Sequence, residues 1–280
     1  MNEMIKILYL FGLVLLLIII SSSVIGSIYS IDEGNVALIN INAEISTSSS
    51  VLSQSISSDS LIASLSEAEN NPNVEAIILS INSPGGTVVA SKEVAKYIKT
   101  LNKTTIAWIR DMGASGAYLI ASACNYIISD ELSMVGNVGA KMSYLSFNGT
   151  LEKYGAKYYE ISSGAMKEIG SEYKDLTKAE YDILYSIVNE SFNYLLDFVT
   201  INRNLDSESI EIIKDGRVFS GSQALAVGLI DKLGSKKEII EYLESINITD
   251  VKIYEISSSN DFDILNLLNY KSNLVYPTYD

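Results

Sequence analysis

A serine and a lysine of this sequence stand in patterns that could support nucleophilic chemistry, with the serine as nucleophile and the lysine as general base. Ser115 lies among glycines and alanines in the run 111–121, at an expected strand-to-helix junction where a hydroxyl can be approached. The same position also fits a helix N-cap or a small residue that allows tight helix packing. Lys167, in the run 163–170, can serve as a general base only if it is neutral. That requires burial in apolar surroundings to lower its pKa by several units, whereas most lysines are solvated surface charges.

The absence of histidine limits the other kinds of chemistry. It excludes a Ser-His-Asp triad, a Cys-His dyad, and the HExxH and Cys/His zinc patterns. The only cysteine, Cys124, is expected to be a small buried apolar residue. A general base that works near pH 7 must therefore be a carboxylate, a lysine or the amino terminus of the chain.

Two adjacent glycines follow an expected buried strand in the run Ser83-Pro84-Gly85-Gly86. Glycines there let backbone N–H groups face a ligand without hindrance from a Cβ atom. A helix expected to begin at about Thr87 adds its positive dipole at the same point. The run is therefore a candidate oxyanion hole, and an ordinary strand-to-helix turn is the alternative interpretation.

The charge of the chain argues against several ligands. Its net charge is −14, and the acidic excess lies after residue 31. Because a phosphate backbone is bound by clustered lysine and arginine, we expect no nucleic-acid partner. No GxGxxG motif opens a helix after a strand and no GxxxxGK[ST] motif occurs, so nucleotide binding has no support. We expect neither a cofactor nor a metal ion.

The first 31 residues are expected to form a membrane anchor. Residues 7–31 carry no charge, and this run is long enough for a helix to cross the hydrocarbon layer with some tilt. A cleaved signal peptide is the competing interpretation. Lys6 lies before this run, and Asp32 and Glu33 follow it. This distribution favours a single-pass protein of the cell membrane with a cytoplasmic N-terminus and an extracytoplasmic body.

The rest of the chain predicts an α/β body over 32–250 and a C-terminal extension over 251–280 that begins with a strand. Residues 46–60 are rich in serine and are expected to form a loop. Since strands and helices alternate, the strands should be largely parallel. We expect strands at 36–42, 76–82, 105–109, 126–128, 158–161 and 251–256, and helices at 59–69, 87–101, 116–123, 177–203, 222–227 and 236–246.

Five ordered segments resemble the signal peptide peptidase A (SppA) family of serine peptidases. They are INSPGG (81–86), MGASGAYLIA (112–121), VGNVGA (135–140), SGAMKEIGS (163–171) and DGRVFSGSQALAVGLIDKLG (215–234). The resemblance covers roughly residues 36–246 and is closest to the short, single-repeat members. It implies a ClpP/crotonase-like fold, in which repeated β-β-α units wind into a superhelix, and a homo-oligomeric ring. It also implies a membrane-anchored enzyme that degrades hydrophobic peptides such as cleaved signal peptides.

The resemblance also implies a role for each site residue. Ser115 would be the nucleophile and Lys167 the general base. The backbone N–H groups of Gly86 and Gly116 would hold the oxyanion, and Gly85 would shape the loop. The extended chain after SPGG would offer an edge to which a peptide substrate adds as a strand.

One departure from the family pattern concerns the surroundings of the lysine. Asn137 stands where the family commonly has a serine whose hydroxyl contacts the lysine. Its amide oxygen can accept a hydrogen bond from an amine, but it is larger and has no hydroxyl. Lys141 and Lys174 are the rival candidates for the base. The alternative functions are an inactive ring-forming scaffold, a stomatin-associated membrane protease of the ClpP class, and a crotonase-like acyl-CoA enzyme.

Overall fold

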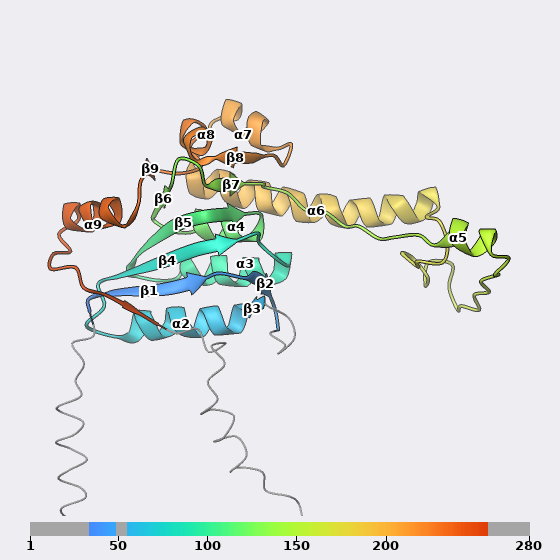
Figure 1. Cartoon of the computed structure of the whole chain (residues 1–280), viewed down its shortest axis with the longest axis horizontal. Helices are drawn as coiled ribbons and strands as arrows, with labels where there is room; N and C mark the ends of the chain where they lie inside the picture. The colour runs from blue at the N-terminus through green and yellow to red at the C-terminus, as the bar shows by residue number, and fades with distance from the viewer. Residues whose placement is uncertain (1–33, 49–54, 257–280) are drawn as a thin grey trace, which may run out of the picture.

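The computed structural model describes residues 34–48 and 55–256, and its central feature is an eight-stranded sheet (Figure 1). Six strands pair in parallel, and a short strand, β7, continues the ladder of β5 and pairs antiparallel with β8. The six parallel strands are, in spatial order, β10 (Ile253–Glu255), β1 (Val36–Ile41), β4 (Ala76–Ser83), β5 (Thr104–Ala114), β6 (Tyr126–Ser129) and β9 (Lys232–Leu233). The antiparallel pair is β7 (Met134–Gly136) with β8 (Val218–Ser220).

The central strand β4 is buried on both faces, which explains its continuous apolar run. Ile77 and Leu79 point into a core formed with α2 (Ser58–Asn70), α3 (Val88–Ile98) and α4 (Gly116–Ser122). Ile78 points into a second core on the opposite face, which α9 (Lys236–Ser245) covers. This three-layer arrangement holds the carboxyl ends of β4 and β5 side by side, with Ser83 in register with Gly113.

A long helix, α6 (Lys178–Arg203), leaves the body and carries an arm at its outer end. We define the arm as residues 141–177, which include α5 (Asn148–Lys153). In Figure 1 this green-to-yellow segment extends from β7 along α6 and folds back to the start of that helix, away from the sheet. The helices α7 (Ser207–Ile213) and α8 (Gly221–Ala226) then return the chain to the body.

Most elements expected from the sequence are confirmed, and three local expectations are wrong. The strand expected at 158–161 is absent, because that segment lies exposed in the arm with no neighbouring strand to pair with. The serine-rich loop expected at 46–60 is shorter, since β2 (Glu44–Ser46) and β3 (Ser55–Ser57) form a two-stranded sheet and α2 begins at Ser58. The strand expected at 105–109 extends to Ala114 because β7 continues its pairing.

The expected membrane anchor, residues 1–31, and the extension beyond residue 256 lie outside the described residues. Within 34–48 and 55–256, no helix combines the length and the apolar character that crossing a bilayer requires.

Candidate active site

Ser115 occupies a strained turn between β5 and α4. Its backbone has φ 53° and ψ −122°, a conformation that non-glycine residues rarely adopt. The Ser115 N–H donates to the carbonyl of Gly136 at 2.8 Å, and the Leu119 N–H donates to the Ser115 carbonyl at 2.9 Å. Ser115 occupies the N-cap position of α4, as one interpretation of the sequence expected, but its hydroxyl makes no capping hydrogen bond to the helix. Strain of this kind persists where the surroundings enforce it, and it gathers at functional sites.

Gly86 points its backbone N–H and C=O groups away from Ile45. The Ile45 N–H donates to the Gly85 carbonyl, and the Thr87 N–H donates to the Ile45 carbonyl, each at 2.8 Å. In such a parallel bridge, the central residue, here Gly86, points its own N–H and C=O away from the partner strand. Among the described residues, the Gly86 N–H makes no hydrogen bond. It is therefore a free donor on the side opposite Ile45.

Gly116 has a second amide close to the first, and it makes no hydrogen bond within the part of the chain that the structure describes. As the first residue of α4, it has no carbonyl of its own helix to bond. A Cβ atom placed on Gly116 would lie 3.3 Å from the nitrogen of Gly86, and one on Gly85 would lie 2.7 Å from the nitrogen of Gly116. Gly85 also has φ 103°, which favours glycine. These three glycines therefore lie close to one another and to Ser115, and the oxyanion role of Gly86 and Gly116 stays a prediction.

The extended chain after SPGG, which was expected to offer an edge for a peptide substrate, is short. The chain after SPGG enters α3 at Val88, and Thr87 is the N-cap of that helix. One side of the extended stretch is already paired with Ile45. Only the opposite side of Gly85–Thr87, on which the Gly86 carbonyl lies, remains for a peptide strand.

Asn137 stabilises a turn, and its side chain makes no hydrogen bond to an amine of the described residues. Its φ of 53° lies in the left-handed region, which asparagine tolerates better than most residues. Its side-chain Nδ2 donates to the Gly216 carbonyl at 2.6 Å, and its backbone N–H donates to the Arg217 carbonyl at 3.0 Å. The side chain therefore connects the end of β7 to the turn before β8.

Lys167 is exposed and lies in the arm, whereas Ser115 lies in the body. Its N–H donates to the Gly164 carbonyl at 3.0 Å within a turn of the arm. The structure thus brings Ser115, Gly85, Gly86 and Gly116 together and leaves Lys167 apart from them. The described residues, 34–48 and 55–256, do not provide the apolar surroundings that a neutral lysine needs.

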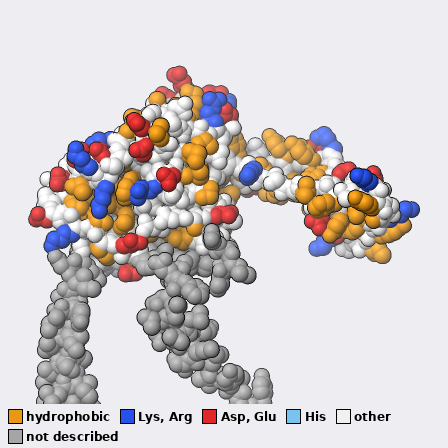
Figure 2. Space-filling model, viewed as in Figure 1, with side chains coloured by type: hydrophobic (Ala, Val, Ile, Leu, Met, Phe, Trp, Pro, Cys, Tyr) orange, Lys and Arg blue, Asp and Glu red, His pale blue; other side chains and the backbone are white. Residues whose placement is uncertain are grey.

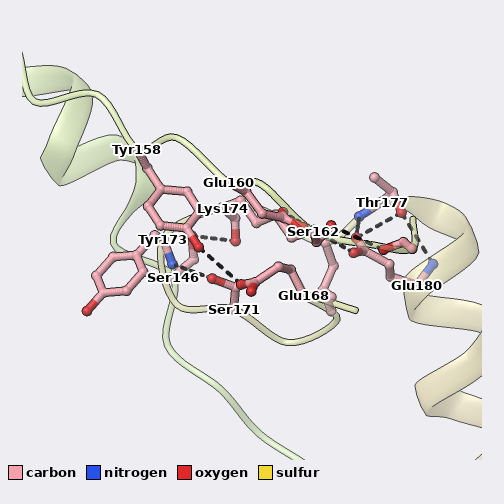
Figure 3. A network of polar contacts seen from close by, with 12 residues as sticks. Ser146, Tyr158, Glu160, Ser162, Glu168, Ser171, Tyr173, Lys174, Thr177 and Glu180 are labelled. Carbon is pink, nitrogen blue, oxygen red and sulfur yellow. Dashed lines mark hydrogen bonds and ion pairs between the residues drawn. The ribbon is translucent and has the colours of Figure 1, made fainter. Parts of the chain in front are cut away.

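The rival lysine Lys174 is held as a cation at the start of α6. Its Nζ lies 2.8 Å from an oxygen of Glu180 and 3.9 Å from an oxygen of Glu160 (Figure 3). The hydrogen bond to Glu180 raises the pKa of Lys174, which is the wrong direction for a general base. The other rival, Lys141, is exposed at the beginning of the arm.

Glu180 connects the arm to α6 through the same network. It is 2% exposed, accepts from Lys174, and accepts from both the N–H and the hydroxyl of Thr177 at 2.9 Å. These hydrogen bonds, first that from Lys174, lower the pKa of Glu180 from 4.5 to about 2. Elsewhere in the arm, the Tyr158 hydroxyl donates to a carboxylate oxygen of Glu168 at 3.1 Å (Figure 3). Glu168 follows Lys167 directly in the sequence.

Acid is therefore expected to loosen the arm. Because the folded-state pKa of Glu180 lies below its unfolded value, its stabilising contribution is complete above about pH 4.5 and is lost as the pH falls toward 2. Hydrogen exchange of residues 141–177, expressed as protection factors, should show this loss in the native chain. Glu180→Gln should have weaker protection at neutral pH and a flatter dependence on acid. Equal pH dependence in the two proteins would contradict the assignment.

Cys124 is buried, as expected from the sequence. Burial raises the pKa of its thiol to about 12, so the thiolate that a nucleophile requires does not form at neutral pH. Its side chain packs in the main core as a small apolar group.

Two contributors to the site were not found from the sequence. Ile45 orients Gly86, but it lies next to a serine-rich stretch with no motif that marks it. The Gly136 carbonyl holds the Ser115 amide. Gly136 belongs to the run 135–140, whose Gly-Asn pair is a signal for a left-handed turn that could have been used.

Comparison with known proteins adds the family context. The model of Peptidase family S49 matches residues 98–248, and the Clp protease model matches residues 36–128. A protein of Methanocaldococcus jannaschii that is named a protease is 30% identical over 209 residues, covering 74% of this chain and 67% of that protein. Protease 4 of Haemophilus influenzae is 28% identical over 191 residues, covering 67% of this chain and 31% of that protein.

Solved structures show the same fold. A serine-to-alanine mutant of the 1510-N membrane-bound stomatin-specific protease has a TM-score of 0.52 at 16% identity and covers 81% of this chain and 99% of its own. A lysine-to-alanine mutant of that protease with a substrate peptide has a TM-score of 0.55 at 16% identity and covers 87% and 100%. With the Clp protease match, they confirm the α/β ClpP-like fold; its division into repeated β-β-α units stays a prediction.

Proposed function

Because the chain belongs to peptidase family S49 and is a serine peptidase, we propose that it cleaves peptides through Ser115 with Lys167 of a neighbouring copy as the base. The observation that carries the proposal is the geometry at Ser115. A strained, partly exposed serine lies beside two free backbone amides in a serine peptidase. That combination has a direct use in acyl transfer, because attack on a carbonyl creates an oxyanion next to the nucleophile.

The proposed reaction has two halves. The Ser115 Oγ attacks the substrate carbonyl carbon, neutral Lys167 takes the hydroxyl proton, and the N–H groups of Gly86 and Gly116 hold the oxyanion. The intermediate collapses to an acyl-enzyme as the C–N bond breaks, and Lys167 gives its proton to the leaving amine. Water then attacks the acyl-enzyme, Lys167 takes the water's proton, and Ser115 recovers one as the acid product leaves.

The position of the arm supports a base from another copy. The arm, which contains Lys167, lies at the outer end of α6, whereas β5 and α4, which flank Ser115, lie in the body (Figure 1). The arm also exposes large apolar side chains, among them Tyr154 at 78%, Tyr159 at 79% and Ile161 at 102% (Figure 2). Exposed apolar patches of this kind mark interaction surfaces. A ring in which each arm lies against the next body would cover these side chains and supply the burial that lowers a lysine pKa.

We further propose the setting and substrate class that the resemblance implies. Residues 1–31 would anchor the chain in the cell membrane with an extracytoplasmic body, and the substrates would be hydrophobic peptides such as cleaved signal peptides. The free side of Gly85–Thr87 would bind such a peptide through its backbone, which does not require a particular side-chain sequence. Profiling the cleaved bonds would separate this activity from that of a stomatin-specific protease, which is the activity named for the solved relatives.

Two inactive chains are expected to restore activity when they are assembled together. Ser115→Ala and Lys167→Ala should each be at background on a hydrophobic fluorogenic peptide. The two full-length chains, co-expressed with different affinity tags and purified through both, should recover about one quarter of the wild-type rate. In a ring of random order, about one interface in four joins an intact serine to an intact lysine.

The matched control is a tagged pair in which both chains carry Ser115→Ala, which should stay at background. A doubly purified mixed assembly that stays inactive while the wild type cleaves would contradict a base from a neighbouring copy. An assembled wild type without activity would instead favour the scaffold interpretation.

A further inference from the structure

The segment 228–231 contacts two helices that serve different parts of the proposed site. The Tyr118 hydroxyl of α4 donates to the Leu229 carbonyl at 2.6 Å, and Tyr118 is fully buried three residues after Ser115. The Arg203 Nε at the end of α6 donates to the Gly228 carbonyl at 3.2 Å. The nucleophile helix and the root of the arm-bearing helix are thus fastened to the same four residues.

An ion pair completes the attachment of α6. The two terminal nitrogens of Arg203 lie 2.7 and 3.1 Å from the two carboxylate oxygens of Asp231, a bidentate geometry. The Arg203 side chain is 9% exposed. Asp231 is itself tied to β6, because its carboxylate accepts from the Ile127 N–H at 2.7 Å and its own N–H donates to the Ile127 carbonyl at 2.9 Å. The pair therefore fixes the end of α6 to the central sheet.

Only the last third of α6 contacts the body closely. Its apolar buried residues are Leu195 and Val199, whereas Tyr181 and Tyr185 near its start are 55% and 56% exposed. The part of the helix before Leu195 is about 26 Å long. A tilt of about 10° about Leu195 would therefore move the start of α6 by about 4.5 Å. Since a misplacement of about 1 Å can cost a hundred-fold in rate, the root contacts have a large influence on the position of the arm.

We propose that Arg203 and Asp231 are positioning residues of the peptidase, whose ion pair sets where the arm presents Lys167 to the neighbouring copy. This inference rests on the proposed function. Neither residue touches the reacting atoms, and both act through the direction of α6. Asp231 lies in the run 215–234, which resembles the family but for which the sequence indicated no function.

A general loss of stability must be separated from a loss of positioning, because breaking a buried ion pair also destabilises a fold. The mixed assembly separates the two. In it, one chain (Lys167→Ala) donates only the serine, and the other (Ser115→Ala) donates only the lysine. Asp231→Asn, which keeps the size of the side chain and removes its charge, can be placed in either chain of the full-length pair.

The expected result is asymmetric. Asp231→Asn in the lysine-donating chain should lower kcat about ten-fold or more with KM nearly unchanged. The same change in the serine-donating chain should leave kcat within about two-fold. Arg203→Lys keeps the positive charge but loses the bidentate contact. In the lysine-donating chain it should lower kcat by less than Asp231→Asn does, and in the serine-donating chain it should leave kcat within about two-fold. Glu241→Gln is the matched control: it removes the exposed partner of Lys232 at 3.1 Å, and the rate should stay within about two-fold in either chain.

Equal losses in both chains would assign the pair a merely structural role and overturn the inference. A loss of kcat confined to the serine-donating chain would also overturn it, because the effect would then act through α4. No loss of kcat in either chain would overturn it as well. If the unmodified mixture itself stays inactive while the wild type cleaves, the base from a neighbouring copy fails, and this inference fails with it. The unmodified pair therefore reports on the proposed function, and the asymmetry reports on Arg203 and Asp231.

Discussion

Ser115→Gly is expected to abolish peptide hydrolysis and to make the protein more stable. The loss of the nucleophile should lower kcat at least about 10⁴-fold. The gain in stability arises because φ 53° and ψ −122° cost a serine about 1 to 3 kcal/mol, a cost that glycine does not have. Glycine loses about 0.5 to 1 kcal/mol to its greater freedom in the unfolded chain. A net stabilisation of about 1 kcal/mol is therefore expected.

Ser115→Ala is the control that separates the two effects. It removes the same hydroxyl and keeps a Cβ atom in the strained conformation, so it should be as inactive as Ser115→Gly but no more stable than the native chain. Thermal unfolding of the three full-length proteins, followed under the same conditions, makes the comparison. A Ser115→Gly protein that unfolds below Ser115→Ala would show that the backbone at this turn is not strained in solution.

Gly116→Ala is expected to lower kcat by about 10² to 10³-fold with little change in KM, the size of effect seen when one oxyanion donor is lost. The new methyl would lie 2.1 Å from the Ser91 Oγ and 2.9 Å from the Ser91 Cβ. The Ser91 Cβ is fixed to the backbone of α3 and Ser91 is fully buried, so the 2.9 Å contact is not relieved by rotation of the hydroxyl alone. The start of α4 would move instead, and the Gly116 amide would leave its place beside Gly86.

Ser91→Gly provides a test by rescue. Combined with Gly116→Ala, it removes the two closest atoms and leaves the methyl 3.3 Å from the nitrogen of Gly86. We expect the double variant to recover part of the lost kcat. Gly139→Ala is the matched control, because its methyl would meet nothing closer than 3.8 Å and the rate should not change. Full activity of Gly116→Ala would exclude its amide from the oxyanion hole.

The local part of the candidate site could be predicted from the sequence because it depends on short-range rules. A buried strand followed by two glycines and a helix requires a tight turn, and φ 103° at Gly85 is the outcome. The carboxyl ends of β4 and β5 then meet because neighbouring parallel strands end at the same edge. The position of Ser115 beside these glycines follows from that pairing.

The arm could not be predicted in the same way. Its residues 158–161 are rich in aromatic and β-branched side chains, but such residues indicate a strand only where a partner strand is available. The direction of α6 depends on contacts between Arg203 and Asp231, which are 28 residues apart in the sequence. The proposed role of Lys167 as a base requires burial, and the residues that the structure describes leave it exposed. In the proposed ring, that burial would come from the packing of chains against one another.

The length of α6 has a consequence for how the proposed activity would be controlled. The helix has 26 residues and is about 39 Å long, and it keeps Lys167 away from Ser115 of the same chain. A newly made chain would then be latent, as a zymogen is, without any segment that has to be removed. Activity would require assembly, so the rate per chain would rise with the local concentration of chains and fall on dilution. Unassembled chains would not cleave neighbouring proteins, and dissociation would inactivate the enzyme reversibly.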